Sequence, residues 1–244
     1  IESFLFNRSQ QVVAEGKTSE TVPVISGVPQ GSVPGALLFL MFINDLPENL
    51  TSDTRLFADD AFVYRQIHSV EDQVILQNDL AKLAEWEQLW GMEFHPRKCS
   101  YLKISRSRKP KTYKYILKGV TLAEETSTKY FGVDIQSNLA RNNHIDRVTN
   151  KANNMLGFLR RNLRSASSET KTNAYITMVR SNLEYCASAW NPHQKKYEQK
   201  IEMVQSRSAR FTLNIDHSIS SVTSMLDELS WETLKSRRIK LQLT

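Results

Sequence analysis

Short apolar stretches alternate with turn-forming residues through the first half of the chain. Residues 3–25 alternate between apolar and polar positions about a turn at residues 15–17, a pattern that predicts a hairpin. The apolar run at residues 36–43 predicts a buried helix from about Gly35 to Leu46, closed by Pro47. Residues 54–66 hold two short apolar strands on either side of a pair of aspartates. This half is therefore expected to mix small strands with helices.

The clearest helical pattern extends from Ser69 to Trp90. Ser69 and Asp72 have the spacing of a capping box, and Gly91 is a natural C-terminal stop. The apolar residues at helical spacing between them are Leu76, Leu80, Leu83 and Trp90. A strand pair is expected next, around residues 101–105 and 113–117, and a further short strand at residues 130–135.

Only helices are expected from His144 onward. The first covers about residues 144–163, with apolar residues on one side: Ile145, Val148, Ala152, Met155, Leu156 and Leu159. Others are expected at about residues 168–188 and 195–213, with a short or broken helix near residues 221–240. A strand-rich part followed by a helix-rich part indicates an α+β fold with a helical appendage.

Charge divides the chain more sharply than its net value of +6 suggests. Residues 1–96 contain 5 basic and 14 acidic residues, whereas residues 97–244 contain 27 basic and 12 acidic residues. An acidic part joined to a basic part suits a metal site beside a nucleic-acid track, and equally an uneven solvated surface.

Cysteine usage and apolar run lengths bear on the cellular compartment. Cys99 and Cys186 lack zinc-ligand spacing, and no secretory signal is visible, so reduced thiols in an intracellular protein are expected, with nucleus and cytoplasm left open. No apolar run approaches the roughly 20 residues that span a bilayer. The chain begins with Ile1 rather than Met, which suggests a fragment.

Asp59 and Asp60 are the strongest candidates for chemistry. Two adjacent carboxylates between apolar strands are costly unless a positive charge compensates them, and a divalent metal such as Mg²⁺ would do so. At a hairpin tip both side chains can approach one site. Two-metal phosphoryl transfer needs at least one further carboxylate. The dipeptide alone also fits an ordinary exposed turn.

Residues 27–32 read Gly-Val-Pro-Gln-Gly-Ser, residues 57–60 read Phe-Ala-Asp-Asp, and residues 130–133 read Tyr-Phe-Gly-Val. The order of these motifs resembles the reverse transcriptases of non-LTR retrotransposons, of the LINE type and similar to the Jockey group. Residues 57–60, Phe-Ala-Asp-Asp, resemble the aromatic-Ala-Asp-Asp box of that family, and residues 27–32 resemble the Pro-Gln-Gly loop that precedes it. Residues 38–46 look like the helix that follows this loop. Residues 91–99 look like the segment with a proton-donating lysine, and residues 130–133 like the strand that grips the primer.

The resemblance implies an incomplete right-hand polymerase palm, an antiparallel sheet with helices, followed by an all-helical thumb and C-terminal helices. Residues 1–140 would be the partial palm, without the fingers and the strand carrying the first Asp. Residues 141–188 would be thumb-like helices, and residues 189–244 a C-terminal helical extension.

The resemblance also implies RNA-directed DNA polymerase activity in the intact parent, by two-metal nucleotidyl transfer. Mg²⁺ is the implied cofactor, and the implied partners are an RNA template, a DNA primer and deoxynucleoside triphosphates. The implied catalytic residues are Asp59, Asp60 and Lys98, of which Asp59 and Asp60 bind metal. Pro29, Gln30, Gly31 and Phe57 would contact nucleotide and template. Tyr130, Phe131 and Gly132 would form the primer grip, and Lys151, Arg160, Arg161 and Arg164 would contact the nucleic-acid backbone.

Two departures from the family pattern bear on activity. The 26 residues before Gly27 contain no Asp, so the third carboxylate is missing from this sequence and the chain alone is expected to be inactive. Pro34-Gly35-Ala36 stands where the family has Leu-Gly-Pro, and Pro34 is expected to bend the start of the helix. The competing functions are a noncatalytic nucleic-acid-binding remnant of a decayed retroelement and, less well supported, another palm-fold phosphotransferase such as a nucleotidyl cyclase.

Overall fold

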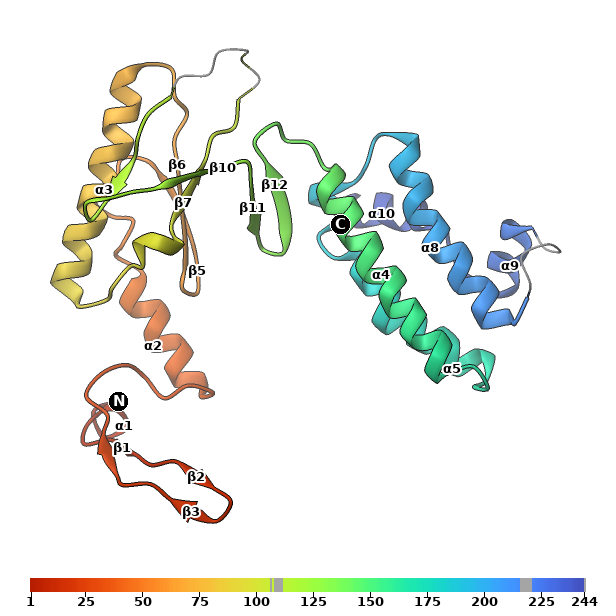
Figure 1. Cartoon of the computed structure of the whole chain (residues 1–244), viewed down its shortest axis with the longest axis horizontal. Coiled ribbons are helices and arrows are strands. Elements are labelled where there is room, and N and C mark those ends of the chain that lie inside the picture. Colours follow the sequence, from red (N-terminus) through yellow and green to blue (C-terminus); the bar gives the residue numbers. More distant parts are fainter. Residues whose placement is uncertain (106, 108–111, 216–220, 244) are drawn as a thin grey trace. The chain divides into compact units, whose positions relative to one another are not determined.

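The computed structural model describes residues 1–105, 107, 112–215 and 221–243. The chain divides into two compact units, which are treated separately below (Figure 1). The first unit contains Ile1–Cys99 and Thr112–Leu122, and the second contains Ser100–Lys111 and Ala123–Thr244. Small two-stranded sheets combined with helices, and a helical C-terminal part, confirm the expected α+β class.

The first unit begins with the short helix α1 (Glu2–Leu5) and a long hairpin. In this hairpin β1 (Ser9–Gln10) pairs with β4 (Val22–Pro23), and β2 (Val13–Ala14) pairs with β3 (Lys17–Thr18), which confirms the predicted turn. The elements that follow are α2 (Val33–Ile43), the hairpin of β5 (Asp53–Phe57) and β6 (Asp60–Tyr64), α3 (Val70–Trp90), the 3₁₀ turn η1 (Pro96–Lys98), β8 (Ile116–Leu117) and β9 (Val120–Thr121).

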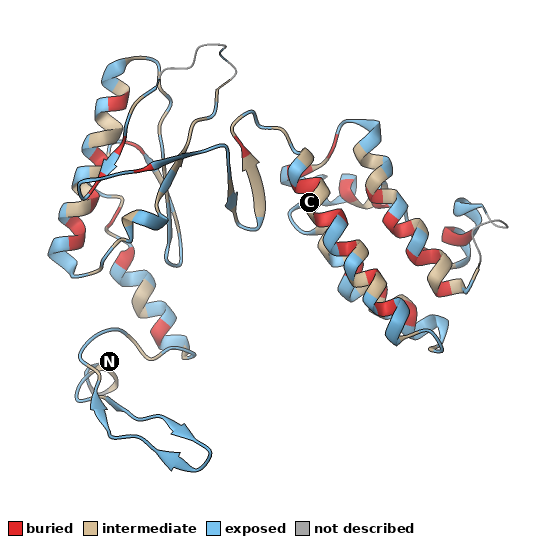
Figure 2. Ribbon diagram, viewed as in Figure 1, coloured by how far each residue is buried: buried red, intermediate tan, exposed pale blue. Residues whose placement is uncertain are grey.

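Both the first and the last turn of helix α3 lie where the sequence predicts. The Ser69 side chain accepts a hydrogen bond from the backbone N–H of Asp72, and the Asp72 carboxylate accepts one from the N–H of Ser69, which completes a capping box. Gly91 closes the helix in the left-handed conformation. Helix α3 packs beside the β5–β6 hairpin, and a small core joins them (Figures 1 and 2). This core contains Ile43, Leu46, Leu83 and Trp86, with Leu56 and Val63 packed against it.

The prediction that the helix after the Pro-Gln-Gly loop is buried was wrong. In α2 only Gly35 and Ile43 are buried, while Val33 is 85% exposed and Met41 67% exposed. Helix α2 carries apolar side chains on all of its sides. Within the described residues, however, the core of the first unit contacts mainly the C-terminal end of this helix. Pro34 lies in the first turn of α2, where proline starts a helix without losing a hydrogen bond.

Two strand predictions also need correction. The segment at residues 101–105 does not pair with residues 113–117. Instead β7 (Ser100–Leu102) pairs in parallel with β10 (Ala123–Glu125), and β8 pairs with β9. A run of basic residues, Arg106 to Lys111, joins the two predicted segments, and residues 106 and 108–111 of it lie outside the described residues. Residues 130–135 are not one continuous strand: Tyr130 ends β11 (Ser127–Tyr130), Phe131 and Gly132 form a hairpin loop, and residues 133–135 belong to β12 (Val133–Gln136). Pairing between strands depends on distant partners, which local alternation does not specify.

The rest of the second unit is helical, as predicted from His144 onward. Its elements are α4 (Asn142–Asn162), α5 (Ser168–Ala174), the π-helical η2 (Tyr175–Arg180), α6 (Ser181–Glu184), α7 (Ala187–Trp190), α8 (Lys195–Leu213), α9 (Val222–Glu228) and α10 (Leu234–Leu243). One hydrophobic core joins residues from α4 to α10, including Ile145, Leu159, Tyr175, Trp190, Ile201 and Leu234, and it appears as the buried stripe on these helices in Figure 2. Within the described residues, no helix combines the length and apolar character that crossing a membrane requires.

Candidate active-site hairpin and nucleic-acid interface

The two aspartates lie at the tip of the β5–β6 hairpin. Phe57 pairs with Asp60, so the loop consists of Ala58 and Asp59 alone. Both carboxylate side chains are exposed, and within the described residues no hydrogen bond or ion pair engages either of them. Phe57, on the strand just before the loop, is 59% exposed. The hairpin thus presents two adjacent carboxylates and an aromatic ring to solvent.

The loop of this hairpin has an unusual backbone. Among the described residues, three other hairpins have two-residue loops with positive φ at both positions and glycine at the second: Glu15-Gly16, Lys118-Gly119 and Phe131-Gly132. This is the type I′ geometry that fits the twist of paired strands. In the aspartate hairpin only the first loop residue, Ala58, has positive φ, at +49°. A side chain with a Cβ is disfavoured at positive φ, so Ala58 holds the aspartates on a strained backbone.

A buried aspartate fixes the base of the same hairpin. Asp79 lies on α3 with no exposed surface, and its two carboxylate oxygens accept hydrogen bonds from the backbone N–H groups of Thr51 and Ser52, at 3.0 and 2.8 Å. These two residues directly precede β5. The sequence predictions missed Asp79, although a signal was present, because this charged residue falls between Leu76 and Leu83 in the apolar row of α3.

The Pro-Gln-Gly loop is held by polar contacts at both ends. Arg8 donates to the carbonyl oxygens of Ser26 and Gly27, at 3.1 and 2.5 Å. At the other end, the Ser32 hydroxyl donates to the carbonyl oxygen of Pro29 and accepts from the N–H of Gly35, and so caps the first turn of α2. A Cβ on Gly35 would lie 2.5 Å from the Pro29 oxygen, so this position requires glycine.

The predicted contact residues of this loop have more open surroundings. Gln30 and Gly31 are exposed, and Gly31 has a φ of +80° that favours glycine. No protein atom lies within 4 Å of a Cβ placed at position 31. Lys98 is exposed at the end of η1, in a separate segment of the first unit.

The carboxylates of the hairpin suit only part of a metal site. Mg²⁺ prefers carboxylate and phosphate oxygens in an octahedral arrangement, and Asp59 and Asp60 have the right chemistry and exposure. Among the described residues, however, no group of three or more His, Cys, Asp or Glu side chains could hold a metal ion. The two aspartates therefore fit a Mg²⁺ site that receives further ligands from elsewhere.

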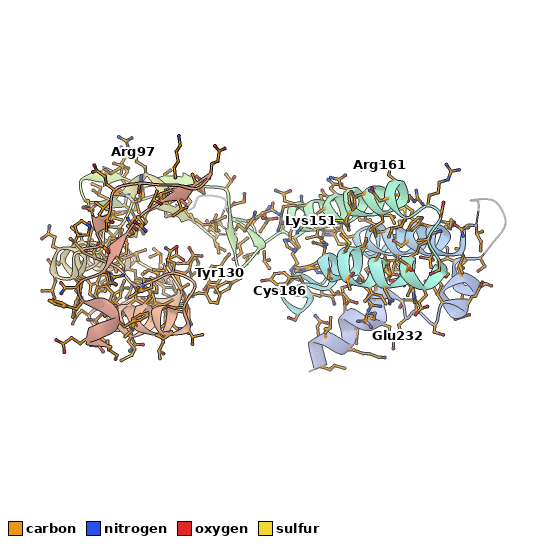
Figure 3. All side chains as sticks on the ribbon, turned by 90° about the horizontal axis from the view of Figure 1, so that it is seen from below. Arg97, Tyr130, Lys151, Arg161, Cys186 and Glu232 are labelled. Atoms are coloured by element: carbon orange, nitrogen blue, oxygen red, sulfur yellow. The ribbon has the colours of Figure 1, made fainter. Side chains whose placement is uncertain are left out.

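In the second unit, the predicted primer-grip residues form the loop of the β11–β12 hairpin. Tyr130 ends β11, and Phe131 and Gly132 are the loop residues, with φ of +47° and +73°. The rings of Tyr130 and Phe131 have centroids 4.1 Å apart. Tyr130 is labelled in Figure 3. The three residues are therefore gathered at one turn, with two aromatic rings beside each other.

An open groove of about 1150 Å³ follows the exposed face of α4, and the sequence predictions did not identify it. Three apolar side chains line it: Met155, Phe158 and Met178. Met178 comes from the π-helical segment η2, a geometry often associated with functional sites. The polar lining includes Lys151 and the amides of Asn150 and Asn154, whose side chains make no hydrogen bond within the described residues. Amide and ammonium donors beside apolar side chains suit the phosphates and sugars of a nucleic acid.

The four predicted backbone-contact cations do not form one row. Lys151 lines the groove, and Lys151 and Arg161 both extend from α4 (Figure 3). Arg160 follows Lys151 by nine residues, or about two and a half helical turns, so it lies on the opposite side of the helix. Its guanidinium donates to the carbonyl oxygen of Arg207 on α8. Arg164 is exposed just beyond the end of α4.

A buried histidine connects α4 to the hairpin. His144 is 1% exposed, its Nδ1 accepts a hydrogen bond from the backbone N–H of Asp134, and its ring packs against Trp190. Burial lowers the pKa of His144, the neighbouring Arg147 charge lowers it further, and Asp134 opposes this shift. His144 is therefore held as a neutral hydrogen-bond acceptor.

Comparison with known proteins adds independent evidence. Residues 1–135 match the family model described as reverse transcriptase (RNA-dependent DNA polymerase). The chain is 28% identical over 239 residues to the probable RNA-directed DNA polymerase from transposon BS of Drosophila melanogaster, covering 91% of this chain and 26% of that protein. It is 25% identical over 223 residues to the RNA-directed DNA polymerase from mobile element jockey of the same organism, covering 86% and 24%.

A third relative is the probable RNA-directed DNA polymerase from transposon X-element of Drosophila melanogaster, at 23% identity over 232 residues, covering 91% of this chain and 25% of that protein. The chain spans about a quarter of the length of these curated relatives. No solved structure matches the chain. Since the family model covers more than half of its residues, the chain belongs to the reverse transcriptase family, with distant homology to the enzymes of these non-LTR retrotransposons.

Proposed function

We propose that the chain contributes the aspartate hairpin and a nucleic-acid-binding surface to an RNA-directed DNA polymerase of a non-LTR retrotransposon. In this proposal residues 1–140 are part of a right-hand polymerase palm, residues 141–188 are thumb-like helices, and residues 189–244 are a C-terminal helical extension. The observation that carries the proposal is the exposed Asp59–Asp60 pair at a hairpin tip, inside the segment that matches the reverse transcriptase family.

The proposed chemistry at the first unit is nucleotidyl transfer. Asp59 would bind the catalytic Mg²⁺ ions and Asp60 would support their charge. These ions would stabilise the attacking oxygen of the primer and the leaving pyrophosphate. Lys98 would donate a proton to the pyrophosphate. Pro29, Gln30, Gly31 and Phe57 would contact the incoming deoxynucleoside triphosphate and the template base.

The proposed ligand of the second unit is the RNA–DNA hybrid formed by template and primer. Lys151 and the asparagine amides of the α4 groove offer donors to phosphates, and the apolar lining offers contacts to sugars. Arg161 and Arg164 add exposed positive charge near the C-terminal end of α4. Tyr130, Phe131 and Gly132 would meet the primer end, because aromatic rings stack on bases of any sequence.

A second candidate function is a noncatalytic nucleic-acid-binding remnant of a retroelement. The observation that favours it is the limited set of carboxylates, since the described residues offer only two at the hairpin tip and no larger metal-binding group. Both candidates predict hybrid binding, and only the first predicts catalysis once the remaining ligands are supplied.

Two measurements test these candidates. The 244-residue chain should bind RNA–DNA hybrid with an affinity that falls steeply as the salt concentration rises. In a plot of the logarithm of the binding constant against the logarithm of the salt concentration, each phosphate contact should add about 0.7–0.9 to the steepness of the slope. A longer chain that includes the residues preceding Ile1 in the parent element should extend a primer with Mg²⁺, and Asp59→Asn should abolish extension while leaving hybrid binding nearly intact. Extension that survives Asp59→Asn would exclude the proposed catalytic role, and absence of hybrid binding would exclude both candidates.

A further inference from the structure

One arginine of the second unit connects the β11–β12 hairpin to α4. Arg147 lies on α4 and lines the groove. Its Nε donates to Oδ2 of Asp134 over 2.6 Å, and its Nη2 donates to the carbonyl oxygen of Gly132 over 2.5 Å. Gly132 is in the hairpin loop and Asp134 is on β12, so one guanidinium bonds to both the loop and a strand.

Two further contacts hold the same hairpin. The backbone N–H of Asp134 donates to the buried His144 on α4 over 3.2 Å. The ring of Tyr185 lies against Gly132, since a Cβ on that glycine would be 3.3 Å from a ring carbon. A two-stranded hairpin alone is marginally stable in water, so these anchors determine where its tip lies relative to α4.

The two cations that line the groove differ in their bonding. The guanidinium of Arg147 is committed to a carboxylate and a carbonyl oxygen, and the 2.6 Å ion pair with Asp134 offsets its charge. Lys151, about one turn further along α4, has no ion pair within the described residues. Lys151 is therefore available to a phosphate, whereas Nε and Nη2 of Arg147 are directed to the hairpin.

We propose that Arg147 is a positioning residue that locks the β11–β12 hairpin to α4, so that the hairpin tip and the α4 groove engage an RNA–DNA hybrid as one surface. This inference rests on the proposed function. The ring pair of Tyr130 and Phe131 then meets the primer end at a fixed distance from the phosphates held along α4. Arg147 acts through the hairpin and makes no contact with phosphate itself.

The test uses the full 244-residue chain and two RNA–DNA hybrids, one blunt-ended and one with a recessed primer end carrying a fluorescent adenine analogue. Hybrid affinity is measured across a range of salt concentrations for the wild type, Arg147→Ala, Arg147→Lys and Lys151→Ala. Fluorescence of the analogue at saturation reports stacking of the hairpin rings on the primer end. Circular dichroism and tryptophan fluorescence verify the folding of each variant.

The two cations should give opposite results. The salt slope is the steepness with which the logarithm of the hybrid-binding constant falls against the logarithm of the salt concentration. Lys151→Ala should reduce this salt slope by about 0.7–0.9 and leave the fluorescence change of the adenine analogue intact. Arg147→Ala should leave the salt slope unchanged, remove the fluorescence change, and lower the preference for the recessed end roughly tenfold, as expected for lost charge-assisted bonds. Arg147→Lys should resemble Arg147→Ala, because an ammonium keeps the charge but cannot fork between Asp134 and Gly132.

Other outcomes would overturn the inference. If Arg147→Ala lowers the salt slope as Lys151→Ala does and keeps the fluorescence change, Arg147 is an ordinary phosphate contact. If Arg147→Ala changes neither the salt slope nor the fluorescence change, Arg147 has no role in hybrid binding. If Arg147→Ala does not fold, Arg147→Lys and Asp134→Asn provide the same comparison. A wild-type chain that binds neither hybrid would refute the proposed function itself, which is a separate result.

Discussion

Phe57 and Asp60 form the last cross-strand pair of the β5–β6 hairpin, which leaves Ala58 and Asp59 as its whole loop. Ala58 has a φ of +49°, where a Cβ is disfavoured by roughly 1 kcal/mol or more. Replacing it with glycine relieves this strain, so Ala58→Gly should slow hydrogen exchange of the hairpin amides and stabilise the first unit by up to about 1 kcal/mol.

A matched control for this variant is Ala61→Gly, on β6 next to Asp60. Ala61 does not have positive φ, so glycine there relieves no strain and only adds freedom to the unfolded chain. Ala61→Gly should therefore destabilise the hairpin. Equal effects of the two variants would contradict the assignment of strain to Ala58.

The buried carboxylate of Asp79 gives a second prediction. Both of its oxygens accept backbone N–H groups, from Thr51 and Ser52. An asparagine amide has one accepting oxygen, so Asp79→Asn leaves one N–H facing another donor and should destabilise the first unit by about 1–3 kcal/mol. Thermal or urea unfolding measures this loss. Asp53→Asn, at the exposed first residue of β5, should change stability little, and a similar loss there would argue against a specific role for Asp79.

His144 makes the stability of the second unit depend on pH. Its folded pKa lies below the ordinary value of 6.5, chiefly because of burial, so the unfolded chain binds more protons as the pH falls below 6.5. The stabilising effect of the neutral ring is fully present above pH 6.5. Stability should decline as the pH falls below about 6.5, with a limiting slope of about 1.4 kcal/mol per pH unit for one proton.

The variants that test this dependence are two histidine replacements. His144→Asn keeps an acceptor near the position of Nδ1 but cannot titrate, so it should flatten the decline in stability. His193→Asn, at an exposed histidine, should leave the decline unchanged. Urea unfolding at several pH values distinguishes them, and an unaltered slope in His144→Asn would show that another group is responsible.

The sequence predicts those features that depend on near neighbours in the chain. The capping box of Ser69 and Asp72 and the apolar row of α4 involve residues three or four positions apart, and both are confirmed. The hairpin tip at Asp59 and Asp60 is likewise local. In contrast, the parallel pairing of β7 with β10 joins segments about twenty residues apart, and strand alternation alone does not select that partner.

The supporting contacts of the candidate sites were harder to predict for the same reason. The partners of Asp79 are 27 and 28 residues away in sequence, and Met178 reaches the α4 groove from a different helix. The turn at Phe131-Gly132 did carry a local signal, since an X-Gly pair is typical of two-residue loops. It was obscured because Tyr130 to Ile135 is otherwise rich in strand-forming residues.

The last prediction separates backbone strain from side-chain contact at Gly132. Gly132 and Gly119 both occupy the second position of a two-residue loop, with φ of +73° and +74°. Alanine at either position carries the same conformational penalty, roughly 1–2 kcal/mol. A Cβ at Gly119 meets nothing within 4 Å, whereas one at Gly132 would lie 3.3 Å from the ring of Tyr185. Gly132→Ala should therefore perturb its hairpin more than Gly119→Ala perturbs its own.

Hydrogen exchange at the hairpin amides measures both effects, and Tyr185→Ala supplies the decisive comparison. If the Tyr185 ring causes the larger perturbation by Gly132→Ala, then Gly132→Ala in a Tyr185→Ala background should destabilise its hairpin no more than Gly119→Ala destabilises its own. The reason is that Gly132→Ala and Tyr185→Ala affect the same contact, so their effects are not additive. The Gly132 variant should also lose the fluorescence change at a recessed primer end, since the displaced hairpin carries Tyr130 and Phe131 with it. Equal costs of the two glycine variants in the wild-type background would show that Tyr185 does not constrain the hairpin.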